Sequence, residues 1–300
     1  MREVAVTAPA KVNLVLRVGA RRPDGYHALA TVYQAVGLHD EVAARRADGF
    51  SVEVRAEREM ALAEVPTDHS NLAVRAALLL AARHGVPEGV HLRIRKGIPV
   101  AGGMAGGSAD AAAALVACDA LWGTQLPQER LLEIAAELGS DVPFALLGGT
   151  AVGTGRGEVV SPVPTSRRLW WVILESTVGL STPEVYREFD RLRPDAPPDP
   201  QVPEGVLTAL RDGDVAGLGA ALHNDLQAAA LSLRPGLAGH LEHGRVGSAH
   251  GAVLAGSGPT CLFLTDGQAH AAELVERLSS HGLGHVSCAP APAAGALQLR

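Results

Sequence analysis

A glycine-rich segment at residues 99–111, PVAGGMAGGSADA, has the composition and spacing of a phosphate-binding loop. Its four glycines leave backbone amides bare, and the helical pattern that begins at Ser108 turns its positive end toward them. A flexible connection, in which Ser108 only caps the helix, is the alternative. Four glycines within six residues cost backbone entropy that a simple connection need not spend, so we favour phosphate binding. The segment is not a P-loop, because no Gly-Lys-Ser/Thr follows.

Only two lysines, Lys11 and Lys96, occur among the 26 basic residues, and the other 24 are arginines. Arginine fills the ordinary surface positions of this chain, so a remaining lysine is expected where a compact ammonium is needed and a planar guanidinium does not fit. Chance is the alternative explanation for this scarcity. Lys11 opens a strand that is apolar on alternate positions, and a lysine that protects a strand edge from aggregation would explain it equally well.

Three shorter segments each have two interpretations. Residues 22–27, RPDGYH, form a Pro-Asp-Gly turn that presents Tyr26 and His27, and the sequence alone favours an ordinary hairpin turn. Asp141 lies in GSDVP, where a carboxylate commonly caps helix amides, and capping is again favoured. Residues 256–260, GSGPT, predict either a hairpin loop or a second amide cradle over a phosphate or over the first glycine-rich loop.

The composition disfavours several classes of protein. The chain has 300 residues, a net charge of -6 and no basic block, which argues against nucleic-acid binding. No apolar run approaches the roughly 20 residues of a membrane span, and the start lacks a signal-peptide pattern. We therefore expect a cytoplasmic protein with small-molecule partners and no membrane or nucleic-acid partner, and a homodimer stays open. A metal hydrolase using His240, His243 and His250 is disfavoured, since their spacing matches no zinc motif, and no metal ligand is predicted.

The first half of the chain alternates short strands with helices. Strands are predicted at residues 4–7, 12–18, 30–36, 51–55 and 91–95, and helices at residues 71–84, 108–121 and 127–138. Residues 148–157, GGTAVGTGRG, are predicted as a loose turn region. We place the domain boundary just after this region, which gives domains at residues 1–160 and 161–300.

The second half begins with a predicted strand at residues 169–174 and contains a Pro-rich surface loop. Helices are predicted at residues 183–192, 205–211, 215–230, 235–242 and 268–281, and strands at residues 252–254, 260–264 and 285–289. The final order of strand, strand, helix and strand resembles half of a ferredoxin-like unit.

PAKVNL near the start, the glycine-rich loop and GSGPT near the end occur in the order of the three motifs of the GHMP kinase superfamily, which the chain resembles. RPDGYH, DHSNLAVRAA, LGSDVPFALLGGTAVGTGRGE and LSTPEVY are similar to one branch of it, whose acceptor is a cytidyl diphosphate derivative of methylerythritol. The resemblance extends to about residue 265. It implies an α+β protein of two domains, an N-terminal ribosomal S5 domain 2-like domain and a C-terminal ferredoxin-like domain, with the active site in the cleft between them.

The activity that this resemblance implies is an ATP-dependent phosphorylation of the acceptor's 2-hydroxyl, which gives the 2-phosphate and ADP in the non-mevalonate pathway to isopentenyl diphosphate. A GHMP kinase for homoserine, galactose or mevalonate is the first alternative, and RPDGYH separates it from the main interpretation, because those acceptors have no nucleobase for this segment to hold. A non-catalytic ATP-binding regulatory protein is the second.

The resemblance also assigns site residues. Lys11 and Asp141 match the catalytic pair, in which the carboxylate accepts or orients the hydroxyl proton and the ammonium stabilises the incipient alkoxide. Positions for ATP, whose phosphates Mg²⁺ would bridge, are Asn71, Lys96, Pro99, Gly102, Gly103, Met104, Gly106, Gly107, Ser108 and Asp110. Positions for the acceptor are Asn13, Tyr26, His27 and Thr182. Tyr26 and His27 match the pair that holds cytosine.

The chain departs from the family pattern at three positions of the glycine-rich segment. Ala101 and Ala105 stand where many relatives have glycine, and Asp110 stands where others have asparagine. Asp110 therefore either approaches magnesium or caps the helix. Thr182 is the least specific of the acceptor positions, because Thr-Pro is also an ordinary helix start.

Overall fold

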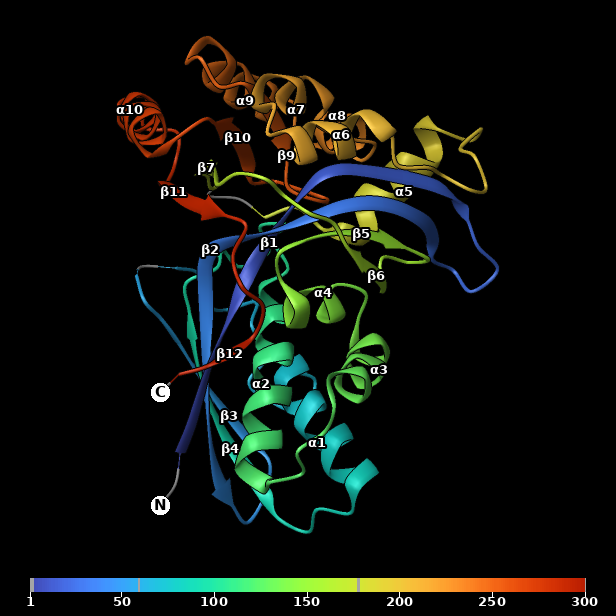
Figure 1. The fold of residues 1–300 in the computed structure, drawn as a ribbon, viewed down its shortest axis with the longest axis vertical. Helices are drawn as coiled ribbons and strands as arrows, with labels where there is room; N and C mark the ends of the chain where they lie inside the picture. The colour runs from blue at the N-terminus through green and yellow to red at the C-terminus, as the bar shows by residue number, and fades with distance from the viewer. Residues whose placement is uncertain (1–2, 59, 177–178, 300) are drawn as a thin grey trace.

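The computed structural model describes residues 3–58, 60–176 and 179–299. Two sheets form its framework (Figure 1). The larger sheet contains β1 (Glu3–Arg21), β2 (His27–Ala47), β3 (Ser51–Ala56), β4 (Gly89–Lys96), β5 (Thr150–Thr154), β6 (Val159–Pro162), β8 (His223–Asn224) and β12 (Leu297–Gln298). Its central order is β12-β1-β2-β4-β3, while β5 pairs with β2 and β6, and β8 pairs with β1.

β1 and β2 are far longer than the predicted strands and form one hairpin that reaches into both halves of the molecule (Figure 1). Their register shifts at Pro9/Ala10, at Asn13/Val15 and near Val18. Such irregularities bend a strand without ending it, and proline is tolerated there because it has no amide to donate to the ladder. The predicted strands at residues 4–7 and 12–18 are therefore one continuous strand.

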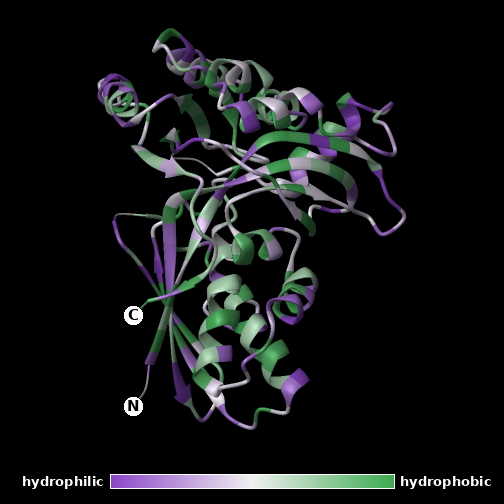
Figure 2. Cartoon of the chain, in the orientation of Figure 1, coloured by the Kyte–Doolittle hydropathy of each residue, from purple (hydrophilic) through white to green (hydrophobic). Residues whose placement is uncertain are grey.

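Four helices lie together on one side of the larger sheet (Figure 1). They are α1 (Leu72–His84), α2 (Gly106–Trp122), α3 (Gln128–Leu138) and α4 (Val142–Leu147). α2 contacts β1, β2, α1 and α4, so nearly all of its sides are covered. Its run of alanines suits this position, because small side chains let neighbouring backbones approach closely, and apolar residues predominate along it in Figure 2.

The smaller sheet contains β7 (Leu169–Leu174), β9 (Gly251–Leu254), β10 (Cys261–Thr265) and β11 (Val286–Ala291). Its order is β11-β7-β10-β9, and every neighbouring pair is antiparallel. Numbered along the chain, this is the order 4-1-3-2 of a ferredoxin-like βαββαβ unit. The predicted ferredoxin-like half and the α+β class are therefore confirmed.

The remaining helices belong to this second half (Figure 1). They are α5 (Thr182–Leu192), α6 (Glu204–Asp212), α7 (Val215–Ala221), α8 (Gln227–Leu233), α9 (Leu237–Val246) and α10 (Gln268–Ser279). None of the helices in the described segments is both long and apolar enough to cross a membrane. β8 and β12 follow residue 160 in the chain yet pair with β1, so the division into residues 1–160 and 161–300 stays a prediction.

Two predicted elements are wrong. The turn region at residues 148–157 holds β5 and leads into β6, and its glycines serve packing, since a Cβ on Gly153 or Gly157 would collide with the Tyr33 side chain. The single helix predicted at residues 215–230 is interrupted by β8. The Asn224 side chain donates hydrogen bonds to the carbonyls of Leu254 and Gly256, an interaction that a local helical pattern cannot reveal.

Candidate active site

A cavity of about 770 Å³ opens between the glycine-rich loop, β1 and α5. Its volume lies within the usual range for small-molecule sites. Among the described residues that line it, the basic side chains are Lys11, Arg21, Arg156 and Arg187, and the acidic ones are Asp141 and Asp190. The chain as a whole is acidic, so this excess of basic groups concentrates positive charge where a polyphosphate would be attracted.

The cavity brings together most of the site residues predicted from the sequence. Those that line it are Lys11, Asn13, Tyr26, His27, Pro99, Gly102, Gly103, Met104, Gly106, Gly107, Asp141 and Thr182. Four predicted residues, Asn71, Lys96, Ser108 and Asp110, are not part of its lining.

The glycine-rich loop ends where α2 begins, at Gly106 rather than at the predicted Ser108. Ala105 is the N-cap residue and makes no side-chain hydrogen bond to the helix, so the capping role considered for Ser108 is wrong. The first amides of an α-helix have no partner within the helix. Here Gly106 and Gly107 place these amides at the wall of the cavity, where they suit an anion.

Ala101 and Ala105, the two alanines that depart from the family pattern, both have positive φ angles, of 53° and 61°. The left-handed region costs a residue with a Cβ about 1 kcal/mol or more. This geometry explains why glycine suits these positions.

The loop is held against two distant segments. The Lys11 amide donates to the Met104 carbonyl, 3.2 Å away, which joins the loop to β1. On the other side, Gly103 has a φ of +78°, and a Cβ there would collide with the Ala255 carbonyl. The loop between β9 and β10 is therefore a hairpin connection that also packs against the glycine-rich loop, while the amide cradle considered for GSGPT stays a prediction.

Lys11 is buried rather than at an open strand edge, so the edge-protection interpretation is wrong. Its Nζ donates to Asn13 Oδ1 at 2.8 Å, and Asn13 Nδ2 donates to Thr31 Oγ1 at 2.8 Å. Thr31 in turn donates to the Val15 carbonyl. This chain of hydrogen bonds fixes the ammonium at the cavity wall.

Asp141 occupies the N-cap position of α4, but its side chain makes no capping hydrogen bond, so the favoured capping interpretation is also wrong. Its Oδ2 lies 3.9 Å from Lys11 Nζ, and its side chain remains partly exposed. Tyr33 is buried beside it, and burial together with the Asp141 carboxylate raises the pKa of Tyr33 well above its ordinary value. The Tyr33 phenol therefore stays protonated. The Asp141 carboxylate faces the cavity, with the Lys11 ammonium beside it.

Tyr26 and His27 also line the cavity. Tyr26 is 53% exposed, and the guanidinium carbon of Arg156 lies 4.9 Å from its ring centroid. His27 is buried, with its ring centroid 4.8 Å from that of Tyr186. His27 Nε2 lies 2.7 Å from Asp190 Oδ1, and because a carboxylate only accepts, this nitrogen carries the proton when Asp190 is ionised.

Thr182 is the first residue of α5, and Ser181 is the N-cap residue, so Thr182 does not act as the cap. Its hydroxyl lies 2.8 Å from the Ser257 hydroxyl, within hydrogen-bond distance. Both side chains line the cavity, and they join α5 to the loop that supports the glycine-rich segment.

Lys96 lies beneath the glycine-rich loop instead of at the cavity wall. Its Nζ forms buried ion pairs with Asp40 and with Asp110 Oδ2, the latter at 2.7 Å. Asp40 Oδ1 also accepts hydrogen bonds from the amides of Gly97 and Ile98, at the start of the loop. The direct contacts with ATP that the resemblance implied for Lys96 and Asp110 do not fit this placement, in which both side chains hold the loop from below.

This buried group has unusual electrostatics. Burial opposes the charge on Lys96, but Asp110 and Asp40 outweigh it and raise the pKa of the ammonium. Burial raises the pKa of Asp110 to about 8, even though Lys96 acts in the opposite direction. Since removing one partner of a buried ion pair leaves an uncompensated charge, the three side chains are expected to act as one unit.

Asn71 is the N-cap residue of α1, where its Oδ1 accepts from the Ala73 amide and its Nδ2 donates to the Pro66 carbonyl. Both polar atoms of the Asn71 side chain therefore form hydrogen bonds within the protein. A second cavity, of about 570 Å³, shares Pro99, Ala101 and Gly102 with the first and extends to Arg58 and Glu175. The glycine-rich loop therefore borders two cavities.

Comparisons with known proteins show the family of the chain. The families described as GHMP kinases N terminal domain and GHMP kinases C terminal match residues 71–149 and 206–283. A 4-diphosphocytidyl-2-C-methyl-D-erythritol kinase of a Nocardioides species is 56% identical over 96% of this chain and 97% of its own. The chain belongs to the family of 4-diphosphocytidyl-2-C-methyl-D-erythritol kinases, within the GHMP kinases. The predicted family is thereby confirmed.

Solved structures extend this result to the fold. A crystal structure of 4-(cytidine 5'-diphospho)-2C-methyl-D-erythritol kinase has a TM-score of 0.77 and 32% identity, and covers 96% of this chain and 99% of its own. A homoserine kinase from Cytophaga hutchinsonii has a TM-score of 0.76 at 18% identity, and covers 100% of this chain and 98% of its own. Because its identity is so low, the second likeness shows a shared fold alone. The two-domain GHMP kinase fold is confirmed.

The sequence interpretation missed several residues that line the site of this family member. They are Arg21, Tyr33, Arg156, Tyr186, Arg187, Asp190 and Ser257. A signal existed for two of them: Tyr186 and Asp190 are four residues apart in a predicted helix and so share one face. Nothing local marks Arg156 in this arginine-rich chain, since it lies in the turn that joins β5 to β6 and its place depends on how these strands pair.

Proposed function

We propose that the protein transfers the γ-phosphoryl group of ATP to the 2-hydroxyl of 4-diphosphocytidyl-2-C-methyl-D-erythritol. The family relationship supports a kinase with this acceptor. The observation that carries the proposal further is the cavity itself, which has a Lys11–Asp141 pair near the glycine-rich loop and aromatic side chains at Tyr26 and His27. A homoserine or galactose acceptor has no flat base that would need the aromatic side chains of Tyr26 and His27.

Lys11 and Asp141 would act on the reacting hydroxyl. Asp141 accepts its hydrogen bond and takes its proton while the hydroxyl oxygen bonds to the γ-phosphorus and the bond from that phosphorus to the β-phosphate oxygen breaks. Lys11 stabilises the charge that develops on the oxygen. Because phosphoryl transfer has a loose transition state, correct positioning of these groups contributes as much as their charge.

The glycine-rich loop would bind the phosphates. The free amides at Gly106 and Gly107 suit phosphate oxygens, and the second cavity beyond the loop has the room for the nucleoside of ATP. Mg²⁺ fits this site as a companion of the phosphates, since it prefers phosphate oxygens and one or two carboxylates, and Asp141 offers a carboxylate at the wall. When bound, the ion would neutralise phosphate charge.

The cytosine would lie between the aromatic side chains that line the cavity. Tyr26 is exposed to the cavity and offers a ring face, while Tyr186 packs against His27. Asp190 fixes the orientation of the His27 ring through Nε2, which leaves Nδ1 as the ring nitrogen available to a base edge. The neighbouring arginines, Arg156 and Arg187, suit the diphosphate of the acceptor.

Replacing Tyr26 by Ala is expected to raise the KM for 4-diphosphocytidyl-2-C-methyl-D-erythritol about tenfold or more, because a base stacked on an aromatic ring contributes roughly 1–3 kcal/mol. The KM for ATP should stay nearly unchanged. Steady-state kinetics with each substrate varied in turn measure both values. Tyr26→Phe is the matched control, since it keeps the ring, and its acceptor KM should stay near that of the wild type. An equal rise in both KM values would contradict the cytosine assignment.

The cytoplasmic location, the absence of nucleic-acid partners and a homodimer stay predictions. The roles assigned to individual site residues here are likewise proposals, and the substitutions at Tyr26, Asp141 and Gly103 test them separately.

A further inference from the structure

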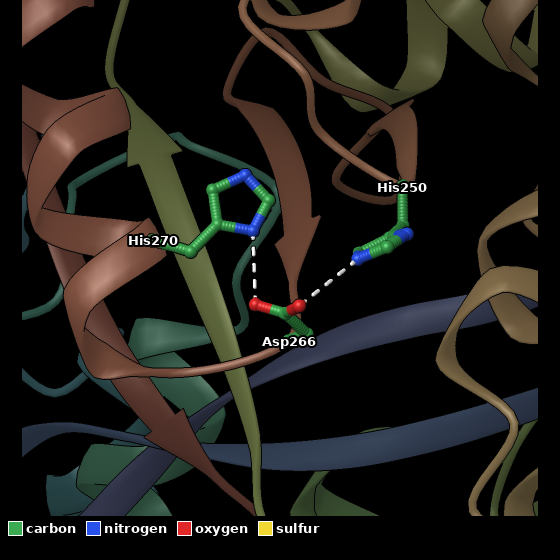
Figure 3. A group of neighbouring side chains, drawn as sticks. All are labelled: His250, Asp266 and His270. Atoms are coloured by element: carbon green, nitrogen blue, oxygen red, sulfur yellow. Dashed lines mark hydrogen bonds and ion pairs between the residues drawn. The ribbon is translucent and has the colours of Figure 1, made fainter.

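Three metal-ligating side chains meet in the second half of the chain, outside the lining of the active-site cavity (Figure 3). His250 directly precedes β9, Asp266 directly follows β10, and His270 lies in the first turn of α10. Asp266 and His270 are four residues apart, so the start of α10 brings them to one side, and the β9–β10 pairing brings His250 to them. The active site does not use any of the three.

The distances within this cluster are those of groups that could share one ion. His270 Nδ1 lies 3.0 Å from Asp266 Oδ1, and His250 Nε2 lies 3.6 Å from Asp266 Oδ2. All three ligand atoms lie within 4.8 Å of one another. In a tetrahedral zinc site with bonds of about 2.0–2.1 Å, neighbouring ligand atoms are roughly 3.3 Å apart. Small side-chain rotations would therefore complete the site.

His250 supplies the second, independent observation. Its Nε2 atom is shielded from solvent and has no hydrogen-bond partner among the described residues, although it points toward Asp266 in Figure 3. A buried polar atom without a hydrogen bond is costly, and a metal ion bound at Nε2 would remove this cost. Asp266 is about half exposed, so an ion could reach the cluster from solvent.

The surroundings also suit a cation. Ser248 Oγ lies 3.4 Å from His270 Nε2 and can accept a hydrogen bond from it once Nδ1 is the ligand. Arg167, the nearby arginine, donates to the Asp266 backbone carbonyl and not to its carboxylate.

We propose that His250 Nε2, Asp266 and His270 Nδ1 bind one Zn²⁺ ion, with water as the fourth ligand. Two imidazoles and one carboxylate suit zinc, whereas Mg²⁺ prefers oxygen ligands throughout. Binding would displace the proton from His270 Nδ1 and leave one on Nε2. The ion would tie together the segment before β9, the end of β10 and the start of α10, and would thus stabilise the second half of the chain. The proposal is independent of the kinase activity.

The alternative is a cluster held only by the hydrogen bond between His270 and Asp266. Zinc binding to the full-length, chelator-treated protein separates the two, measured by competition with a chromophoric chelator. We expect one Zn²⁺ per chain, and an affinity about tenfold weaker or more in His250→Ala and in His270→Ala. His281→Ala is the matched control, because its ring packs against His243 outside the cluster, and it should bind zinc as the wild type does.

Thermal denaturation gives a second readout that does not depend on Mg-ATP. Zn²⁺ should raise the Tm of the wild type and of His281→Ala, but not that of His270→Ala. Asp266→Asn keeps the shape of the side chain, so it tests the site even if a histidine variant fails to fold. This variant should also bind zinc at least about tenfold more weakly than the wild type. The proposal is overturned if the wild type binds no zinc in the competition assay, or if Asp266→Asn and both histidine variants bind it like the wild type.

Discussion

Asp141→Asn is expected to lower kcat about 10²-fold or more while ATP binding is retained. Asparagine keeps the size of the side chain but cannot take a proton, and it removes the charge that faces Lys11 Nζ at 3.9 Å. Since the Asp141 side chain does not cap α4, its loss should not destabilise the fold. Single-turnover kinetics measure the chemical step, and equilibrium binding of a fluorescent ATP analogue measures the donor site.

Asp190→Asn is the matched control for this experiment, because it makes the same chemical change in the same cavity. Asp190 contacts His27 rather than the reacting groups, so its substitution should raise the acceptor KM and leave the chemical step nearly unchanged. Full turnover in Asp141→Asn would contradict the mechanism. An equal loss of turnover in the two variants would show a general effect of charge in the cavity instead.

Gly103→Ala is expected to lower kcat/KM for ATP about 10²-fold. The new Cβ would collide with the Ala255 carbonyl, and the positive φ of Gly103 adds strain. The loop must shift by about 1 Å to make room, and a displacement of that size at a positioned site can cost about 10²-fold in rate. Because Met104 accepts a hydrogen bond from the Lys11 amide, the shift should also disturb the catalytic lysine.

Gly205→Ala provides the control for this substitution. Gly205 lies in α6, where a Cβ would meet nothing within 4 Å, and the residue does not line the active-site cavity. Its kinetics should match those of the wild type. If Gly103→Ala kept normal kinetics with ATP, the two loops would not need their close contact, and the proposed support of the phosphate-binding segment would be wrong.

The sequence predicts the family and the outline of the fold well, because the residues that carry them form continuous motifs. PAKVNL, the glycine-rich segment and RPDGYH each place their functional groups within a few residues, and the cavity brings groups from all three together. Helix starts and strand lengths are less accurate. α2 begins two residues before Ser108, since Ala105 adopts the N-cap position without a capping side chain.

Interactions between distant segments explain the failures. The glycines of residues 148–157 indicated a turn from their type alone, whereas Gly153 in β5 and Gly157 after it make room for the Tyr33 side chain. The resemblance implied a place near the nucleotide for Lys96, and nothing local indicated its buried partners Asp40 and Asp110, which are 56 and 14 residues away in the chain. The cluster of His250, Asp266 and His270 likewise depends on strand pairing, so the sequence grouped His250 with His240 and His243 instead.

The most direct test of the central claim is ADP release by the purified protein with Mg-ATP and four acceptors offered separately. They are 4-diphosphocytidyl-2-C-methyl-D-erythritol, homoserine, galactose and mevalonate, each with Asp141→Asn as the control. We predict turnover with the cytidyl acceptor alone, and its loss in the variant. Turnover with another acceptor, or none with any acceptor despite ATP binding, would contradict the account.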